Sequence, residues 1–144
     1  MDIERNKATL RRVFEEGFSH GRLEVVDECL APGAVDHHDF TDDAPDFRSH
    51  LKGVITMLRT AMPDLTMSVE DLVAEGDRVA ARVILTGTHT GDAFFGVPAA
   101  GTAVRVEQFH FVQCDDDGRG VTHWANAGEH ELMSQIAAGV LTPG

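Results

Sequence analysis

The sequence predicts an α+β fold in which three N-terminal helices are followed by a strongly curved antiparallel sheet. Apolar residues recur at helical intervals through the first 62 residues. From residue 65 onwards they alternate with polar residues, which is the period of a strand with one buried face. Because the helices precede the strands, we expect the sheet to wrap around them as a cone open at one end, an α+β barrel.

The helical part of the chain divides into three segments. Residues 2–20 form an amphipathic helix, with apolar residues at helical spacing and charged residues between them. A short second helix over 23–30 ends at the Ala-Pro-Gly stretch 31–33, and an extended piece follows over 34–40. The third helix, 47–62, ends before a proline. Its apolar stripe consists of Phe47, Leu51, Val54, Leu58 and Met62.

The first predicted strands are two short runs of alternating residues, 65–69 and 79–85, joined by the turn at 75–77. A loop rich in glycine and proline follows at 88–101. Near the C-terminus, residues 129–141 fit either a final helix or a segment that covers a strand edge.

Residues 101–128 read as a long hairpin that carries polar side chains where a core strand would not. Alternation places Gln108 and His110 on the side of the first strand that also carries valines, and Trp124 and Asn126 together on one face of the second. The opposite faces carry Phe109 and Phe111 on the first strand and His123, Ala125 and Ala127 on the second. Each unpaired buried polar group costs ~1–3 kcal/mol. The polar side chains of the hairpin therefore predict that it forms the floor of a pocket rather than part of a plain apolar core.

Length and charge limit the classes of partner. A chain of 144 residues fits one domain, residues 1–144, with a single core. Its formal charge of −12 repels phosphate backbones and anionic lipids, so we expect neither a nucleic-acid nor a membrane partner. The N-terminus has no apolar run of a signal peptide. Cys29 and Cys114 form no metal or redox spacing, which indicates free thiols in a reducing cytoplasm.

Other site chemistries find little support in the sequence. The eight histidines form no pair spaced with a carboxylate as metal ligands are, so no metal site is predicted. No serine lies in a nucleophile elbow, and the glycines match no phosphate-binding loop.

Several motifs resemble the SnoaL-like polyketide cyclase family, within the nuclear-transport-factor-2-like (NTF2-like) group of folds. They are APGAVDHHDF, the run PDL…EGDRVAAR…GTHTG…G, THW in the last strand, and LMSQI. The resemblance implies a curved antiparallel sheet, a conical pocket closed by helices, and a homodimer formed through the outer face of the sheet. It also implies ring closure of a hydrophobic, carbonyl-bearing small molecule by intramolecular aldol condensation, with side-chain acid/base groups and no cofactor.

Two histidines are the candidate catalytic residues. His110 lies on the pocket strand, and an imidazole donates or accepts protons at neutral pH. The alternative is a strand histidine hydrogen-bonded across the sheet. His37 corresponds to the histidine of the family's VDH motif, and the alternative is a buried residue that ties the loop to a helix. Since neighbouring side chains in an extended piece point to opposite sides, His38 is expected to be solvated. The remaining histidines are expected at the surface or in structural roles: His20, His50, His89, His123 and His130.

The candidate ligand-binding residues are Trp124, Asn126, Gln108 and Phe94. Trp124 is expected either to form a pocket wall that stacks on a flat ligand or to lie in the core. Asn126 is suited to orient a ligand carbonyl. Phe94 lies in the loop before the hairpin, where it lines the pocket mouth or fills a dimer seam.

One position departs from the family pattern. Relatives commonly carry an Asp four residues beyond the tryptophan of the last strand, where this chain has Gly128. We therefore expect a binding pocket with weak cyclase activity, which Gly128→Asp should raise. The alternatives are a non-catalytic binding protein of the same fold, or an isomerase or hydrolase of the NTF2-like group.

Overall fold

The structure is a computed structural model that describes residues 2–37 and 44–141. Its helices are α1 (Ile3–Arg12), α2 (Glu24–Cys29), α3 (Phe47–Ala61) and α4 (Glu129–Leu141), and a π-helical segment, η1 (Val13–Phe18), continues α1. Its strands are β1 (Leu30–Asp36), β2 (Thr66–Glu75), β3 (Arg78–His89), β4 (Thr102–Cys114) and β5 (Gly120–Asn126). None of the helices in these two ranges is long and apolar enough to span a membrane.

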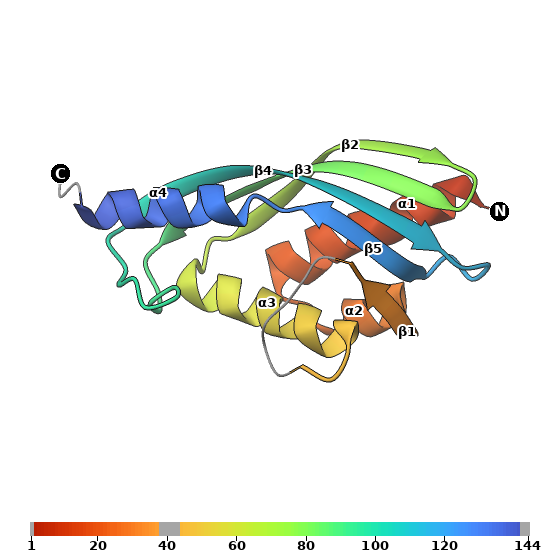
Figure 1. Ribbon diagram of the computed structural model, residues 1–144, viewed down its shortest axis with the longest axis horizontal. Helices are drawn as coiled ribbons and strands as arrows, with labels where there is room; N and C mark the ends of the chain where they lie inside the picture. Colours follow the sequence, from red (N-terminus) through yellow and green to blue (C-terminus); the bar gives the residue numbers. More distant parts are fainter. Residues whose placement is uncertain (1, 38–43, 142–144) are drawn as a thin grey trace.

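Within the described ranges the strands form one curved sheet in the order β1-β5-β4-β3-β2. Helices α1, α2 and α3 lie under its concave face, and α4 packs on β4 near one end (Figure 1). The prediction of an α+β fold with a curved sheet around three N-terminal helices is confirmed. Of the two alternatives for residues 129–141, the structure shows the helix.

The edge strand β1 is the main departure from the predicted sheet. It runs parallel to β5, whereas the other pairings are antiparallel. The strand includes Pro32, inside the stretch that was expected only to end the second helix. Proline lacks a backbone N–H and is tolerated at a sheet edge, so the same residue both stops α2 and permits β1.

The first helix carries aromatic side chains into the concave face. Asp2 caps α1 by accepting a hydrogen bond from the Arg5 backbone N–H at 3.0 Å. In η1 the backbone widens to π-helical bonding, a feature that is frequent near functional sites. Phe14 and Phe18 of this segment are both buried, with ring centroids 5.9 Å apart.

Strand β4 has the alternation that the sequence predicts. Val106 and Gln108 are buried on the concave side. Phe109 and Phe111 point the other way, with 51% and 38% of their surfaces exposed. The side of β4 that carries His110 therefore faces the helices.

Candidate functional site

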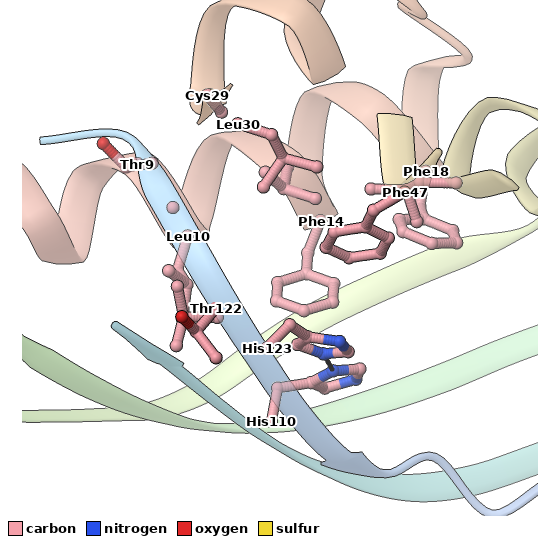
Figure 2. Close-up of a pocket in the computed structure, with 14 residues that line it drawn as sticks. Thr9, Leu10, Phe14, Phe18, Cys29, Leu30, Phe47, His110, Thr122 and His123 are labelled. Carbon is pink, nitrogen blue, oxygen red and sulfur yellow. Dashed lines mark hydrogen bonds between the residues drawn. The ribbon is translucent and has the colours of Figure 1, made fainter. Parts of the chain in front are cut away.

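A small cavity lies between η1, the start of α3 and the inner faces of β4 and β5 (Figure 2). Its volume is about 60 Å³. Most of its wall is hydrocarbon, contributed by Leu10, Val13, Phe14, Leu30, Phe47 and Val112 among others. The polar side chains on the wall include two imidazoles, His110 and His123.

A continuous chain of hydrogen bonds crosses the sheet at this wall. Asp36 Oδ1 is 2.8 Å from His123 Nδ1, and His123 Nε2 is 2.9 Å from His110 Nδ1. His110 Nε2 is in turn 2.8 Å from Gln108 Oε1. The four residues come from β1, β5 and β4, which are neighbours in the sheet, and Asp36 is the direct register partner of His123. The strand order therefore aligns the four side chains.

Aromatic rings cover the two imidazoles. The rings of His110 and His123 lie nearly parallel, 22° apart, with centroids 5.2 Å apart, and the hydrogen bond joins them edge to edge. Phe14 lies 4.7 Å from His110, and Phe47 stacks on His123 at 5.4 Å (Figure 2). Only 3% of the Asp36 side chain and 14% of the His123 side chain are exposed. In such a dry environment each hydrogen bond of the chain is stronger than it would be in water.

Two of the predicted site residues, His110 and Gln108, are brought together as their strand parity indicated, and His110 lines the cavity. His123, expected to be a surface or structural residue, completes the group. It is the register partner of Val112, a residue with its side chain in the cavity wall. The signal that identifies it is the pairing register of the hairpin, which alternation within one strand does not reveal.

The expected placement of Trp124 and Asn126 in the pocket is wrong. Trp124 pairs with Phe111 across β4 and β5, with the rings edge to face at 5.7 Å, and Asn126 is exposed opposite Phe109. Both therefore lie on the outer face of the sheet. The cause is a register shift next to Cys114, which inverts the parity of β5 relative to β4.

His37 and Phe94 also lie away from the cavity wall. His37 is exposed; its backbone N–H donates to the His123 carbonyl at 2.8 Å and its ring stacks on Trp124 at 5.0 Å. Phe94 is 3% exposed, packed in the core with its ring edge to face with that of Phe95. The prediction for His38 lies outside the described residues.

Gly128 is not among the residues that line the described cavity. It follows β5 and has a φ of +64°, a conformation that L side chains rarely adopt. A Cβ atom there would lie 2.5 Å from Val106 Cγ1. The β5 residue that faces His110 is Ala125. An aspartate at this position would be strained. The effect of Gly128→Asp on activity stays a prediction.

The two thiols are poor nucleophiles. Cys29 and Cys114 are free and buried, and burial raises the pKa of both, that of Cys114 to about 11. Cys29 lines the cavity as a neutral thiol. Among the described residues, no three or more His, Cys, Asp or Glu side chains are grouped so that they could hold a metal ion.

Comparison with known proteins identifies the family. The model of the SnoaL-like polyketide cyclase family matches residues 8–136. IdmH, a candidate polyketide cyclase from Streptomyces antibioticus, is 30% identical, with 95% of this chain and 99% of IdmH covered and a TM-score of 0.75. A candidate SnoaL-like polyketide cyclase from Jannaschia sp. CCS1 is 26% identical, with 96% of each chain covered and a TM-score of 0.78.

A third solved structure supports the fold. TsrD from Streptomyces laurentii is 22% identical, with 96% of this chain and 98% of TsrD covered and a TM-score of 0.82. No curated protein matches the chain. The match of the family model over most of the sequence nevertheless settles its membership: the chain belongs to the SnoaL-like polyketide cyclase family.

Proposed function

We propose that this protein is a cofactor-independent acid/base enzyme that closes a ring in a hydrophobic, carbonyl-bearing small molecule by intramolecular aldol condensation. The observation that carries the proposal is the hydrogen-bonded chain Asp36–His123–His110–Gln108 on the wall of an apolar cavity. Three of these four side chains titrate. Titratable side chains packed against hydrocarbon favour a role in proton transfer over a role in stability, since buried charged groups are costly.

In this proposal His110 is the proton carrier. An aldol closure removes a proton from a carbon next to one carbonyl and adds a proton to the oxygen of a second. An imidazole performs both transfers near neutral pH. Gln108, which is hydrogen-bonded to His110, is the residue to which we assign the polarisation of a substrate carbonyl, in place of His37 or Asn126.

The cavity size bears on the choice of substrate. Pockets for drug-sized ligands usually measure ~300–1,000 Å³, whereas this cavity measures about 60 Å³. A ligand of several rings therefore requires wall residues such as Leu51, which is only partly buried, to move aside. A small bicyclic ketone is the better probe of the chemistry.

The test is deuterium exchange at the α-carbon of 1-tetralone in D₂O, followed by NMR. Wild-type protein should accelerate the exchange, and His110→Asn should reduce that acceleration ~10²–10⁴-fold, the usual contribution of a general acid/base. The matched control is His130→Asn, a change at an exposed histidine of α4. Equal exchange by wild type and His110→Asn would contradict the role of His110.

A second candidate is a binding protein of the same fold without chemistry. Ala125 favours it, because this register partner of His110 offers no carboxylate that could act as a separate base. Tetralone binding without faster exchange would support this candidate. Faster exchange without ring closure of a keto ester would instead support an isomerase.

The free cysteines support our further proposal that the protein acts in the cytoplasm, on a small molecule and without a nucleic-acid or membrane partner.

A further inference from the structure

We propose that the cavity binds an uncharged ligand with a short alkyl group, which fits between α1 and the start of β5, and that Gly120 sets the size of this group. That the ligand is the substrate rests on the proposed function. Binding itself is a property of the cavity and can be tested without any turnover.

The cavity has a hydrocarbon end beside Gly120, which we call the apolar end. Its wall consists of Cys29, Leu30, Val112 and Gly120. Figure 2 shows Cys29 and Leu30 on the opposite side of the cavity from His110. On β5, Gly120 precedes His123 by three residues, which is roughly 10 Å along a strand. A ligand that spans the cavity therefore has one end at the imidazoles and the other against hydrocarbon.

Gly120 is a glycine for reasons of space. Its φ lies outside the left-handed range, so the backbone does not require glycine there. A Cβ atom would lie 3.1 Å from Leu30 Cδ2 and 3.2 Å from Val112 Cγ1, closer than ordinary van der Waals contact. Both of those side chains line the cavity. A methyl group at Gly120 therefore takes up room in the apolar end, either itself or through the shift of these two side chains.

The wall of the cavity is suited to a ligand without charge. Among the described residues that line it, none is a lysine or an arginine. The Cys29 thiol is neutral, because burial raises its pKa. The Thr9 hydroxyl is already engaged with the carbonyl oxygens of Arg5 and Gly118, at 3.1 and 2.6 Å. A carboxylate or phosphate in the cavity would lose its hydration without gaining a lysine or arginine as its partner.

The volume limits the length of the alkyl group. The cavity measures about 60 Å³. At ~10–15 Å³ for each water-sized group, it holds about four to six non-hydrogen atoms. A carbonyl beside His110 and an alkyl group of about three or four carbons account for this number. Because hydrocarbon walls offer water few hydrogen bonds, the alkyl group enters without displacing tightly held water.

The experiment compares 3-methyl-2-butanone with pyruvate. The two molecules have the same number of non-hydrogen atoms, and pyruvate carries a carboxylate where the ketone has an isopropyl group. Binding to wild-type protein is followed by NMR of ¹³C-labelled methyl groups. We expect the ketone to shift the methyl signals of Leu30 and Val112. Pyruvate should bind at least ~10-fold more weakly, because its carboxylate would be buried against hydrocarbon.

Gly120→Ala tests the residue that sets the size. It should weaken the binding of 3-methyl-2-butanone ~10-fold or more, the usual effect of one methyl group in an apolar pocket. Acetone, with a methyl group in place of the isopropyl group, should be affected much less, because it does not fill the apolar end. Gly33→Ala is the matched control. Gly33 is an exposed glycine of β1 with nothing within 4 Å of where its Cβ would be.

Three results would overturn the inference. Pyruvate that binds as tightly as the ketone would contradict an uncharged ligand, and this comparison needs no variant to fold. Unchanged methyl signals of Leu30 and Val112 would contradict the site. Equal ketone binding by Gly120→Ala and Gly33→Ala would contradict the role of Gly120.

The same measurements separate this inference from the proposed function. If 3-methyl-2-butanone binds at the apolar end but 1-tetralone does not exchange, the proposed function fails and the binding site stands. If 1-tetralone exchanges while the ketone leaves both methyl signals unchanged, the binding site fails and the proposed function stands.

Discussion

Gly128 illustrates how a single backbone angle decides what a position can do. Its φ of +64° is strained for an L side chain, and a Cβ atom would lie 2.5 Å from Val106 Cγ1, so that Val106 would have to shift. We expect Gly128→Asp to lower the free energy of unfolding by ~1–3 kcal/mol from backbone strain alone, with the clash against Val106 adding to this. Thermal and urea unfolding measure the change.

A matched control comes from α3. Gly53 is exposed within that helix, and nothing lies within 4 Å of where its Cβ would be. Gly53→Ala should raise the free energy of unfolding by ~0.5–1 kcal/mol, because alanine is the better helix former. If Gly128→Asp proves as stable as wild type, the left-handed conformation is not required there.

At the scale of elements, the hairpin of β4 and β5 shows which side-chain directions can be predicted from the sequence. Alternation within β4 is enough to predict that Gln108 and His110 face inward, since every residue of that strand follows one period. It does not predict the parity of β5, because the register shift at the turn is set by backbone pairing rather than by side-chain type. A slip of one residue moves every side chain of a strand to the other face. Trp124 therefore lies on the outer face and His123 on the inner face, the reverse of what the sequence predicted.

The parallel pairing of β1 with β5 could not be predicted from the sequence either. Asp36 joins the site because β1 returns beside β5, a contact between residues 87 positions apart that no local pattern encodes. The helices were easier to predict, because the apolar stripe of α3 and the Asp46 cap that accepts from Ser49 at 2.8 Å are local features. Tertiary pairing, rather than propensity, therefore completes the candidate site.

The connection between α3 and β2 is tied to β3 by one carboxylate. Asp64 accepts hydrogen bonds from the Thr88 backbone N–H at 2.7 Å and from its hydroxyl at 2.8 Å. The backbone bond is the main reason that the pKa of Asp64 is lowered. Because the folded pKa lies below the unfolded value of about 3.9, this stabilisation is present above that pH and is lost as pH falls through the folded pKa.

We therefore expect Asp64→Ala to lower the free energy of unfolding by about 1 kcal/mol at pH 7, and by less at acid pH. Urea unfolding at several pH values measures the difference. Glu75→Ala, at an exposed acid at the end of β2, should show no such dependence. A difference for Asp64→Ala that grows toward acid pH would contradict this account.

At the scale of the whole molecule, the outer face of the sheet carries a row of apolar side chains. Register partners place Val73, Ala80, Phe111 and Trp124 in line across β2, β3, β4 and β5. Val73 is 65% exposed, and Phe109 lies beside the row with 51% exposed. The Arg78 guanidinium covers part of it, 5.9 Å from the Phe111 ring centroid and 5.6 Å from that of Trp124. A contiguous apolar surface of this kind usually marks an interface.

A homodimer formed through this face is the arrangement we expect, because a two-fold axis would place each apolar row against its own copy. Sedimentation velocity at micromolar concentration should show a dimer of the wild-type chain. Val73→Lys should shift it to the monomer, since it would bury a charge in the interface. Val140→Lys, the same change at an exposed valine of α4, should leave the dimer intact. A monomeric wild type, or equal behaviour of the two lysine variants, would rule out this face as the interface.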